Sequence, residues 1–584
     1  MFKALTSAII AGALVLGGLA GNASAGVTIN TKYVEGTDSA APMFNPLVVN
    51  TFNLTMPQST IDGLSGATNN WANEGPYLPA TLAGTINGVS FGPLNVGVHL
   101  KGAWGSWRNI YGKAGFKIKV DAFDKTANVF GITKFTLNNM VQDHSSIHET
   151  LSYRLFRAVG VPTARTGYVN ITVNGQNYGL HLNLETTDKV LMNRYGIIPS
   201  HIYKGGVPTF PDLWPGQENL YAIDQGSTTD VSDLSAVMAV VGRGNGVNWF
   251  HDMSALVDLQ EMTLDWAAES FVGHWDGYVH NHNNFYLVKR QDGKFIMLPW
   301  GMDQTWNGGV DYWSGATLVT QCKNDSQCVA LYRQALSKVV TTAKALKLNV
   351  QATEVAAAIN PTLYADPKKE FGNQEVPGVQ QAAINFINQQ VANGSVMIAP
   401  WDTSLSDFGI AASGVYQAID TPIVVANAVT RISLSGRPFS SNATAAAPTN
   451  APLAVGQNKL KITVTNNISR GTQSFDVTVI RRALINKTFN VVFPKNSSML
   501  ASSGRLAVTN SVATVLNPVT PTVTLTMQQP VGLTKNKALA LLKARMAPIL
   551  NALAKSNIVP QTVTLVIAPV RVANAVQVSL NYEN

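Results

Sequence analysis

The stretch GHWDGYVHNHNNFYLVKRQDGKFIMLPWGMDQTW, residues 273–306, decides the fold of the central part of the chain. It contains two apolar runs, Phe285 to Val288 and Phe295 to Leu298, and between them Asp292-Gly293, a dipeptide typical of tight hairpin turns. We therefore predict an antiparallel hairpin. Because a hairpin returns the chain to its starting point, the loop before its first strand and the loop after its second strand are expected to lie side by side.

Acidic and amide side chains are concentrated in those two loops. Asp276 and Asn281 lie in the first loop, which ends at Asn284, and Asp303 lies in the second. Phosphoryl transfer needs one carboxylate to orient the attacking hydroxyl, and a second carboxylate with an amide oxygen to hold the metal at the phosphates. Protein kinases supply these groups as an Asp, an Asn shortly after it and a second Asp. The order of residues here predicts the same chemistry.

The N-terminal residues have the pattern of a secretory signal peptide. Lys3 precedes an apolar run from Ala4 to about Ala20, and Ala23-Ser24-Ala25 is a small-residue cleavage pattern. Residues 1–25 are therefore predicted to be a signal peptide. No later uncharged stretch reaches the ~18 apolar residues that a membrane span needs. We expect a secreted, periplasmic or cell-surface bacterial protein without a transmembrane segment after cleavage.

Charge and cysteine content narrow the class of partner. The formal net charge is +8, but only 13% of the residues are charged and no run of Lys and Arg occurs. We therefore expect no nucleic-acid partner, whereas mild basicity suits an anionic cell envelope. Cys322 and Cys328 are expected to form a short-loop disulfide in an oxidising compartment rather than a zinc site.

The chain of 584 residues is too long for one hydrophobic core, and its composition changes near residues 402–412. Before that point, strands are mixed with helices. In Phe116-Lys117-Ile118-Lys119-Val120 the alternation places the apolar residues on one face of a strand and the lysines on the other. Residues 407–482 have short alternating strands typical of a β-sandwich. In residues 483–584 strands flank one helical pattern, which predicts a small α+β module.

Three further elements of the first part are predicted from local patterns. A helix is expected from about Ser146 to Val159, with Ser146 and Glu149 as a capping box. A hairpin is expected to turn at Asn174-Gly175. A long helix from about Ser254 to Val272 would lead into the loop that holds Asp276.

Taken in order, several motifs resemble the CotH kinase family, the secreted atypical kinases of the spore coat protein H type. The resemblance covers roughly residues 51–390 and rests on VGVHLKGAWGSW, FKIKVDAF, the segment from LNNMVQDHSS to LHLNLE, IYKGG, and GHWDGYVHNHNNFYL with LPWGMDQTW. It implies an α+β fold with a two-lobed kinase-like domain over residues 45–400. The implied activity is transfer of the γ-phosphoryl of ATP to protein Ser or Thr hydroxyls with Mg²⁺ or Mn²⁺.

The resemblance also assigns roles to single residues. Asp276 corresponds to the catalytic acid and Asp303 to the principal metal ligand, while either Asn281 or Asn284 would be the second metal ligand.

The expected cofactor-binding residues are Lys101 and Gly102 in the glycine-rich segment, Lys117 in the strand that follows, and Lys204 after an apolar strand. Glu149 has two interpretations, as the capping residue of its helix or as the helix acid that pairs with a phosphate-binding lysine.

Departures from the family pattern keep other functions open. Members commonly have an acid where this chain has Gly301, and an Arg where it has His148. One alternative is therefore a catalytically silent surface or adhesion protein built on a kinase-like scaffold. Another is a metal-dependent hydrolase, in which His274, His280 and His282 would join the two acids around zinc or manganese.

The remaining segments resemble modules of bacterial surface proteins. Residues 407–482 are similar to cadherin-like sandwich modules, and residues 483–584 are faintly similar to the OmpA-like peptidoglycan-binding fold. These resemblances imply attachment to the cell wall or envelope through the C-terminal modules.

Overall fold

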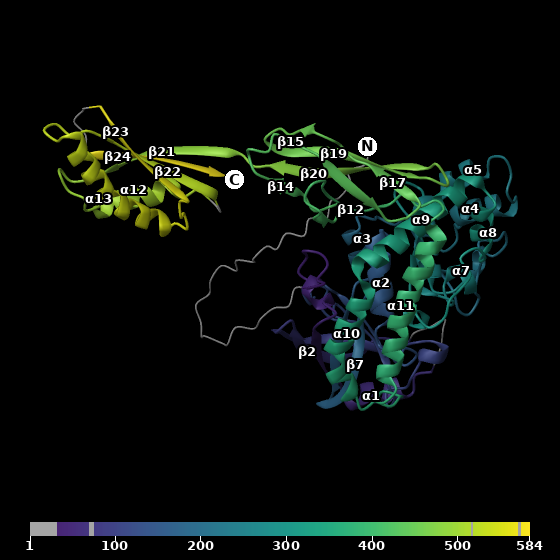
Figure 1. Ribbon diagram of the computed structural model, residues 1–584. Helices are drawn as coiled ribbons and strands as arrows, with labels where there is room; N and C mark the ends of the chain where they lie inside the picture. Colours follow the sequence, from purple (N-terminus) through teal and green to yellow (C-terminus); the bar gives the residue numbers. More distant parts are fainter. Residues whose placement is uncertain (1–31, 69–74, 516–517, 570–573) are drawn as a thin grey trace. The chain divides into compact units, whose positions relative to one another are not determined.

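The computed structural model of the protein describes residues 32–68, 75–515, 518–569 and 574–584 (Figure 1). The predicted signal peptide lies outside the described residues. The chain divides into two compact units, one formed by residues up to 335 with 342–390, the other by residues 336–341 with 391–584. Both units combine helices with strands, which confirms the predicted α+β class. Among the described residues, no helix has the length and apolar character needed to cross a membrane.

A closed barrel with the strand order β1-β2-β3-β4-β5-β7-β6 forms one end of the first unit. Neighbouring strands are antiparallel, except that β1 and β6 run parallel where the barrel closes. The hairpin predicted around Asn174-Gly175 is confirmed as β6 and β7. The strands are β1 (Val49–Thr55), β2 (Leu78–Ile86), β3 (Val89–Lys101), β4 (Gly115–Lys119), β5 (Lys134–Asn138), β6 (Thr166–Val173) and β7 (Gln176–Glu185).

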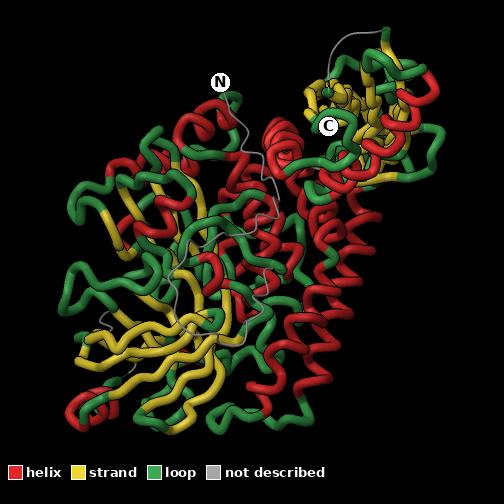
Figure 2. Tube along the Cα trace, turned by 90° about the vertical axis from the view of Figure 1, so that its left-hand side faces the viewer, coloured by secondary structure: helices red, strands yellow, loops and turns green. Residues whose placement is uncertain are grey.

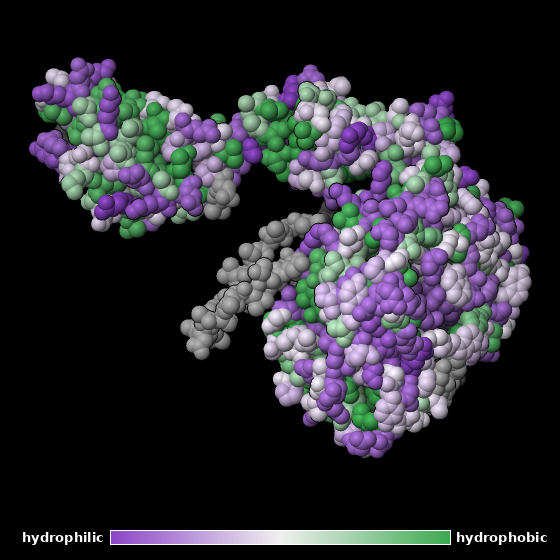
Figure 3. Space-filling view, turned by 60° about the horizontal axis from the view of Figure 1, so that its bottom comes forward, coloured by the Kyte–Doolittle hydropathy of each residue, from purple (hydrophilic) through white to green (hydrophobic). Residues whose placement is uncertain are grey.

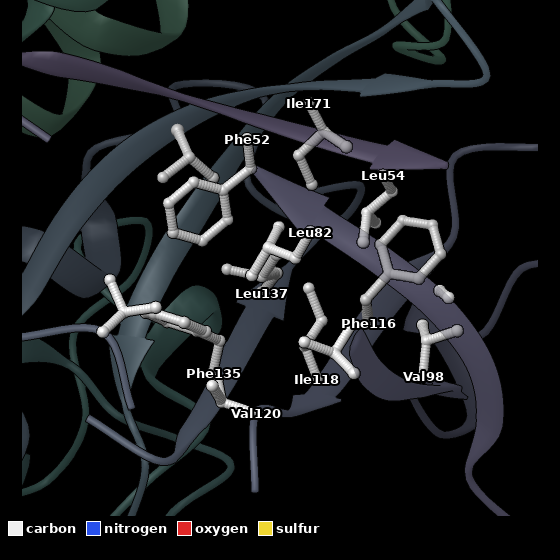
Figure 4. Packing of buried hydrophobic residues seen from close by; sticks show 14 of the residues in the cluster. Phe52, Leu54, Leu82, Val98, Phe116, Ile118, Val120, Phe135, Leu137 and Ile171 are labelled. Atoms are coloured by element: carbon white, nitrogen blue, oxygen red, sulfur yellow. The ribbon is translucent and has the colours of Figure 1, made fainter. Parts of the chain in front are cut away.

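Apolar side chains fill the barrel, as Figure 4 shows for Phe52, Leu82 and Phe116. Because successive residues of a strand face opposite sides, Phe116 and Ile118 of β4 point inward and are fully buried, while Lys117 lies on the outer face. The alternation predicted for this strand is confirmed. Each fully buried Phe or Leu of this kind stabilises the fold by ~1.5–3 kcal/mol.

The predicted hairpin at residues 285–298 is confirmed as β10 (Phe285–Lys289) and β11 (Phe295–Pro299), which pair antiparallel. They belong to a second sheet with the order β11-β10-β8-β9, completed by β8 (His201–Gly205) and β9 (Ala222–Gln225). Figure 2 shows the barrel strands gathered in yellow at one end of this unit, with long helices in red alongside.

The helices of this region are α1 (Gln58–Ser65), α2 (His148–Val159), α3 (Lys189–Arg194), α4 (Ser232–Gly242), α5 (Trp249–Leu256), α6 (Leu259–Val272), α7 (Tyr278–Asn281), α8 (Thr317–Lys323), α9 (Ser326–Leu346), α10 (Leu348–Tyr364) and α11 (Val376–Ile398). The helix expected from Ser254 to Val272 is in fact two, because the chain leaves helical geometry at Val257 and Asp258 caps the new start at α6. On the face of the first unit seen in Figure 3, hydrophilic residues cover much of the surface and apolar residues are scattered among them.

The predicted capping box at the start of α2 is wrong. The helix begins at His148 with Ile147 as its N-cap and has no side-chain cap, and Ser146 has a positive φ of 60°. The backbone N–H of His148 is instead bound by the carboxylate of Asp143 at 2.9 Å. Glu149 is therefore available for another role.

The expected disulfide between Cys322 and Cys328 is present and joins the end of α8 to the start of α9. Both cysteines are buried.

Nine strands between residues 405 and 481 pack around one core made by their inward-facing side chains. They form sheets with the orders β13-β12-β16, β14-β20-β19-β17 and β15-β18. The strands are β12 (Leu405–Ile410), β13 (Tyr416–Gln417), β14 (Ile423–Val425), β15 (Arg431–Ile432), β16 (Leu434–Pro438), β17 (Ala443–Ala446), β18 (Ala451–Pro452), β19 (Gly456–Asn466) and β20 (Thr472–Arg481).

The last segment forms a four-stranded sheet with the order β21-β24-β22-β23, on which α12 and α13 pack through a shared core. Its elements are β21 (Leu484–Val492), α12 (Ser502–Val512), β22 (Val519–Gln528), α13 (Lys535–Ala554), β23 (Thr562–Ala568) and β24 (Ala575–Glu583).

Candidate functional site

A cavity of about 610 Å³ lies between the outer face of the barrel and the second sheet of the first unit. This volume is in the range of small-molecule sites. All nine residues singled out from the sequence line it, namely Lys101, Gly102, Lys117, Glu149, Lys204, Asp276, Asn281, Asn284 and Asp303. The hairpin does return the chain as expected, because the acids before β10 and after β11 face the same cavity.

The barrel contributes side chains from the outer faces of adjacent strands. Lys101 ends β3, Lys117 lies in the middle of β4 and Asn138 ends β5. Gly102 follows β3 with a φ of +131°, and a Cβ there would lie 2.8 Å from the Cα of Trp107. Glycine is therefore required where the chain turns from β3 along the cavity wall.

Three asparagine amides hold the carboxylate of Asp276. Asn281 and Asn283 donate through Nδ2 to Oδ1 at 2.6 and 3.0 Å, and Asn284 donates through Nδ2 to Oδ2 at 2.9 Å. In each of these amides the N–H donates to the carboxylate, so the amide oxygen points in another direction. The carboxylate is therefore fixed in orientation, and the amide oxygens of the loop are turned away from it.

The oxygens of these amides distinguish Asn283 from its neighbours. Asn283 Oδ1 accepts from the backbone N–H of Val207 at 3.1 Å, which ties the loop that holds Asp276 to the segment after β8. Asn281 and Asn284, the two candidates from sequence, remain the amides suited to a ligand. Asn283 had no assigned role, because only the folded chain shows which amide the Val207 backbone occupies.

Asp303 lies in a short 3-10 turn, Met302–Gln304, directly after the hairpin. Desolvation, together with the charges of Asp143 and Asp276, raises the pKa of its carboxyl to about 6, against the opposing effects of a backbone hydrogen bond and of Lys101. Asp143 and Asp276 thus place negative charge near this carboxyl, which favours binding of a cation beside it.

Glu149 faces the cavity from the first turn of α2 and is 3% exposed. Burial raises its pKa to about 8, and the nearby charge of Asp303 contributes. Both of its oxygens accept from Asn138 Nδ2, at 3.0 and 2.9 Å. Of its two interpretations, the structure excludes the capping residue and places the side chain beside the lysine-bearing wall. Asn138 was missed because no local pattern marks it.

Lys204 reaches the cavity from the second sheet. Its Nζ lies 4.8 Å from the centre of the Trp300 ring, and in β8 it is paired with Tyr286 of β10. Cations therefore line the cavity from both sides, with Lys101 and Lys117 on the barrel.

Gly301 is the position at which the resemblance leads us to expect an acid, and its surroundings leave no room for a side chain. Its φ is +59°, and a Cβ would lie 2.6 Å from Oδ1 and Cγ of Asn284. The amide of Asn284 occupies the space that a side chain at this position needs.

The donor set of the cavity consists of oxygens. Within the described ranges, no group of three or more His, Cys, Asp or Glu is arranged to hold a metal. Asp303 with one or two amide oxygens fits a hard cation such as Mg²⁺ or Mn²⁺, which takes its other ligands from water and phosphate.

The histidines do not form a zinc site. His274 is buried, its Nε2 faces the backbone oxygen of Gly301 at 3.1 Å, and burial lowers its pKa to about 4. His282 Nε2 lies 3.6 Å from a carboxylate oxygen of Asp212. The described part of the chain therefore lacks the set of His and acidic ligands that a metal-dependent hydrolase would need.

Comparison with known proteins gives two matches. Residues 98–393 match the family model described as CotH kinase protein, and this range contains every residue of the candidate site named above. Inner spore coat protein H of Bacillus subtilis (strain 168) is 21% identical over 262 residues, which covers 41% of this chain and 71% of that protein.

Proposed function

Because this chain belongs to the CotH kinase family, we propose that its first unit binds ATP with Mg²⁺ or Mn²⁺ and transfers the γ-phosphoryl to Ser or Thr hydroxyls of a protein substrate. One observation carries the proposal. Asp276 and Asp303, separated by the hairpin, line the same cavity, together with the lysines that a triphosphate needs.

The residues that would hold the metal are Asp303 and the amide oxygens of Asn281 and Asn284. When bound, the metal neutralises charge on the phosphate oxygens. Asp303 suits this role because it lines the cavity from a short turn after the hairpin, and His148 of α2 holds its backbone oxygen.

Asp276 would accept a hydrogen bond from the acceptor hydroxyl and orient its oxygen toward the γ-phosphorus. Such a role requires a carboxylate in a single orientation. The amides of Asn281, Asn283 and Asn284 supply it, because they bind both carboxylate oxygens and leave little rotational freedom.

The ammonium groups of Lys101, Lys117 and Lys204 would bind the triphosphate from two sides of the cavity. Gly102 would let the backbone after β3 approach the nucleotide closely, since no Cβ fits there.

For location, we propose an extracellular or surface-associated protein. The signal-peptide pattern, the disulfide between Cys322 and Cys328, and the similarity to a protein named for the spore coat support it. The sandwich and the α+β module after residue 404 would attach the kinase domain to the cell wall or envelope.

The second candidate function is a catalytically silent surface protein that uses the kinase-like domain for binding. Gly301 favours it, because the space of the missing acid is filled by Asn284. The two functions differ in whether phosphate is transferred.

Intact-mass measurement of the mature protein after incubation with ATP and Mn²⁺, with a Ser/Thr peptide panel, separates these functions. We expect added phosphate with the wild type, none with Asp276→Ala, and wild-type labelling with Asp124→Ala, which removes an exposed acid that does not line the cavity. ATP binding without labelling by the wild type would support the silent protein. Equal labelling by wild type and Asp276→Ala would overturn the role of Asp276.

A further inference from the structure

Three polar side chains from different elements form a hydrogen-bonded relay in the cavity wall. Lys101 Nζ donates to Asn138 Oδ1 at 2.5 Å. Asn138 Nδ2 donates to both carboxylate oxygens of Glu149, at 3.0 and 2.9 Å. The amide therefore stands between the Lys101 ammonium and the Glu149 carboxyl group. Its oxygen accepts from the lysine and its nitrogen donates to the glutamate.

The barrel is shaped so that Lys101 can reach Asn138. Strand β4 lies between β3 and β5, and Lys101 is paired with Gly115 at the start of β4. A Cβ on Gly115 would lie 3.0 Å from Lys101 Cγ and 3.1 Å from the backbone oxygen of Leu137. The lysine side chain crosses β4 at Gly115, where the strand has no side chain. Gly115 therefore leaves room for the relay although it makes no polar contact with its members.

We propose that Asn138 is the positioning residue of this site, and that its amide sets where the Lys101 ammonium meets the phosphates and where Glu149 is held. The nucleotide part of this inference rests on the proposed function, whereas the relay itself does not. The rival arrangement is a direct Lys101–Glu149 ion pair, in which the amide would be dispensable.

Alternative roles for Asn138 are weaker. Its neighbour Asn139 has a purely structural role, since its Nδ2 donates to the backbone oxygens of Ser106 and Lys113. Both asparagines line the cavity, but only Asn138 contacts two ionisable side chains through its amide. A substitution at Asn138 therefore changes the cavity wall that faces the ligand.

An exchange of the Asn138 amide and the Glu149 carboxyl tests the relay. Asn138→Asp places a carboxylate against Glu149 and should weaken binding of ATP with Mg²⁺ about tenfold or more, as expected for hydrogen bonds to charged groups. In Asn138→Asp/Glu149→Gln, the amide and the carboxylate have changed places. Lys101 can then donate to the new aspartate, which accepts from the new glutamine on its other side. Binding should recover most of the loss.

Two measurements are made on the full-length mature chain. Calorimetric titration with ATP and with adenosine, each with Mg²⁺, shows whether the loss is confined to the triphosphate, as a positioning role requires. Thermal unfolding without nucleotide tests the relay independently, since Asn138→Asp should lower the melting temperature and the exchange should restore it. Failure of the wild type to bind ATP would sink the proposed function and leave this second measurement decisive for the relay.

The inference is overturned if adding Glu149→Gln to Asn138→Asp lowers both affinity and melting temperature further, because a direct Lys101–Glu149 pair predicts that result. It is also overturned if Asn138→Asp behaves as the wild type in both measurements.

A variant outside the polar chain gives a second test. Gly115→Ala should displace Lys101 and weaken ATP binding more than adenosine binding. The matched control is Gly112→Ala, where the nearest atoms to a new Cβ are at 3.5 Å, an ordinary contact. Equal ATP affinity of these two variants would contradict the path of Lys101 over β4.

Discussion

The imidazole Nδ1 of His148 lies 3.0 Å from the backbone oxygen of Asp303, and this contact ties the first turn of α2 to the loop after the hairpin. The link is doubled, because Trp306 Nε1 donates to the backbone oxygen of His148 at 3.2 Å. His148 is only 8% exposed. The position of the Asp303 carboxyl is thus set by a residue far away in the sequence.

The His148 contact predicts a graded response to substitution. His148→Phe keeps a ring but removes the donor, and should weaken Mn²⁺-dependent ATP binding about tenfold, the size reported for supports of ligating groups. His148→Asn places an amide N–H near the position of Nδ1 and should retain most of the affinity. Calorimetric titration of both variants with ATP and Mn²⁺ checks this. Equal losses for both variants would show that the hydrogen bond to Asp303 is unimportant.

Asp303 itself should control the metal requirement. Asp303→Asn removes the charge but keeps the shape, and is expected to reduce ATP affinity in the presence of Mn²⁺ by about 100-fold or more. Binding measured in EDTA should change little. Asp311→Asn, an exposed acid later in the same loop, serves as the control. If Asp303→Asn binds ATP with the wild-type response to Mn²⁺, the assignment of the metal ligand fails.

Because Asn284 fills the space beside Gly301, we predict that an aspartate at position 301 does not increase phosphate transfer. Gly301→Ala should lower the free energy of unfolding for two reasons. The positive φ costs ~1–2 kcal/mol with a side chain present, and the new Cβ would lie too close to Asn284. Gly293→Ala is the matched control, because its φ is +84° but a Cβ there meets nothing within 4 Å.

Urea unfolding of the two alanine variants separates the cost of the positive φ from the cost of the contact with Asn284. Gly301→Asp should be destabilised like Gly301→Ala and show no gain in phosphate transfer. The same unfolding midpoint for Gly301→Ala and Gly293→Ala would mean that the Asn284 side chain can move aside without loss of stability.

His274 predicts a pH dependence of stability. Its pKa is lowered by burial to about 4 in the folded chain, below the ~6.5 of an unfolded histidine. Between these values the unfolded chain binds a proton that the folded chain does not, so stability rises with pH. It is lost as the pH falls from about 6.5 to about 4, by up to roughly 3 kcal/mol.

His274→Gln should flatten this slope, since glutamine keeps an N–H for the backbone oxygen of Gly301 and does not titrate. His251→Gln, with a side chain that is 87% exposed, should leave the slope unchanged. Unfolding midpoints at several pH values between 4 and 7 provide the comparison, and parallel curves for the two variants would speak against His274 as the source.

Local patterns were sufficient for the elements that position the site. The turn at Asp292-Gly293 and its flanking apolar runs predicted the hairpin, and with it the meeting of Asp276 and Asp303 at one cavity. The alternation in β4 predicted that Lys117 would face away from the core. These features depend on residues close in sequence, whose preferences the barrel and sheet preserve.

Contacts between distant segments were not accessible in this way. Ser146 and Glu149 satisfy the capping pattern, but Asp143 binds the helix start and leaves the glutamate to Asn138. Asn138 carries no motif, and its role follows only from the pairing of β3, β4 and β5 in the barrel.

Because the barrel is closed, residues that pack its interior alternate along each strand with residues that face outward. In β3, β4 and β5, one set of alternate residues fills the interior, while part of the other set, including Lys101, Lys117 and Asn138, lines the cavity. A combinatorial library restricted to the outward set would vary ligand preference while leaving the packed interior intact. The ligand range of this cavity is therefore open to redesign one strand face at a time.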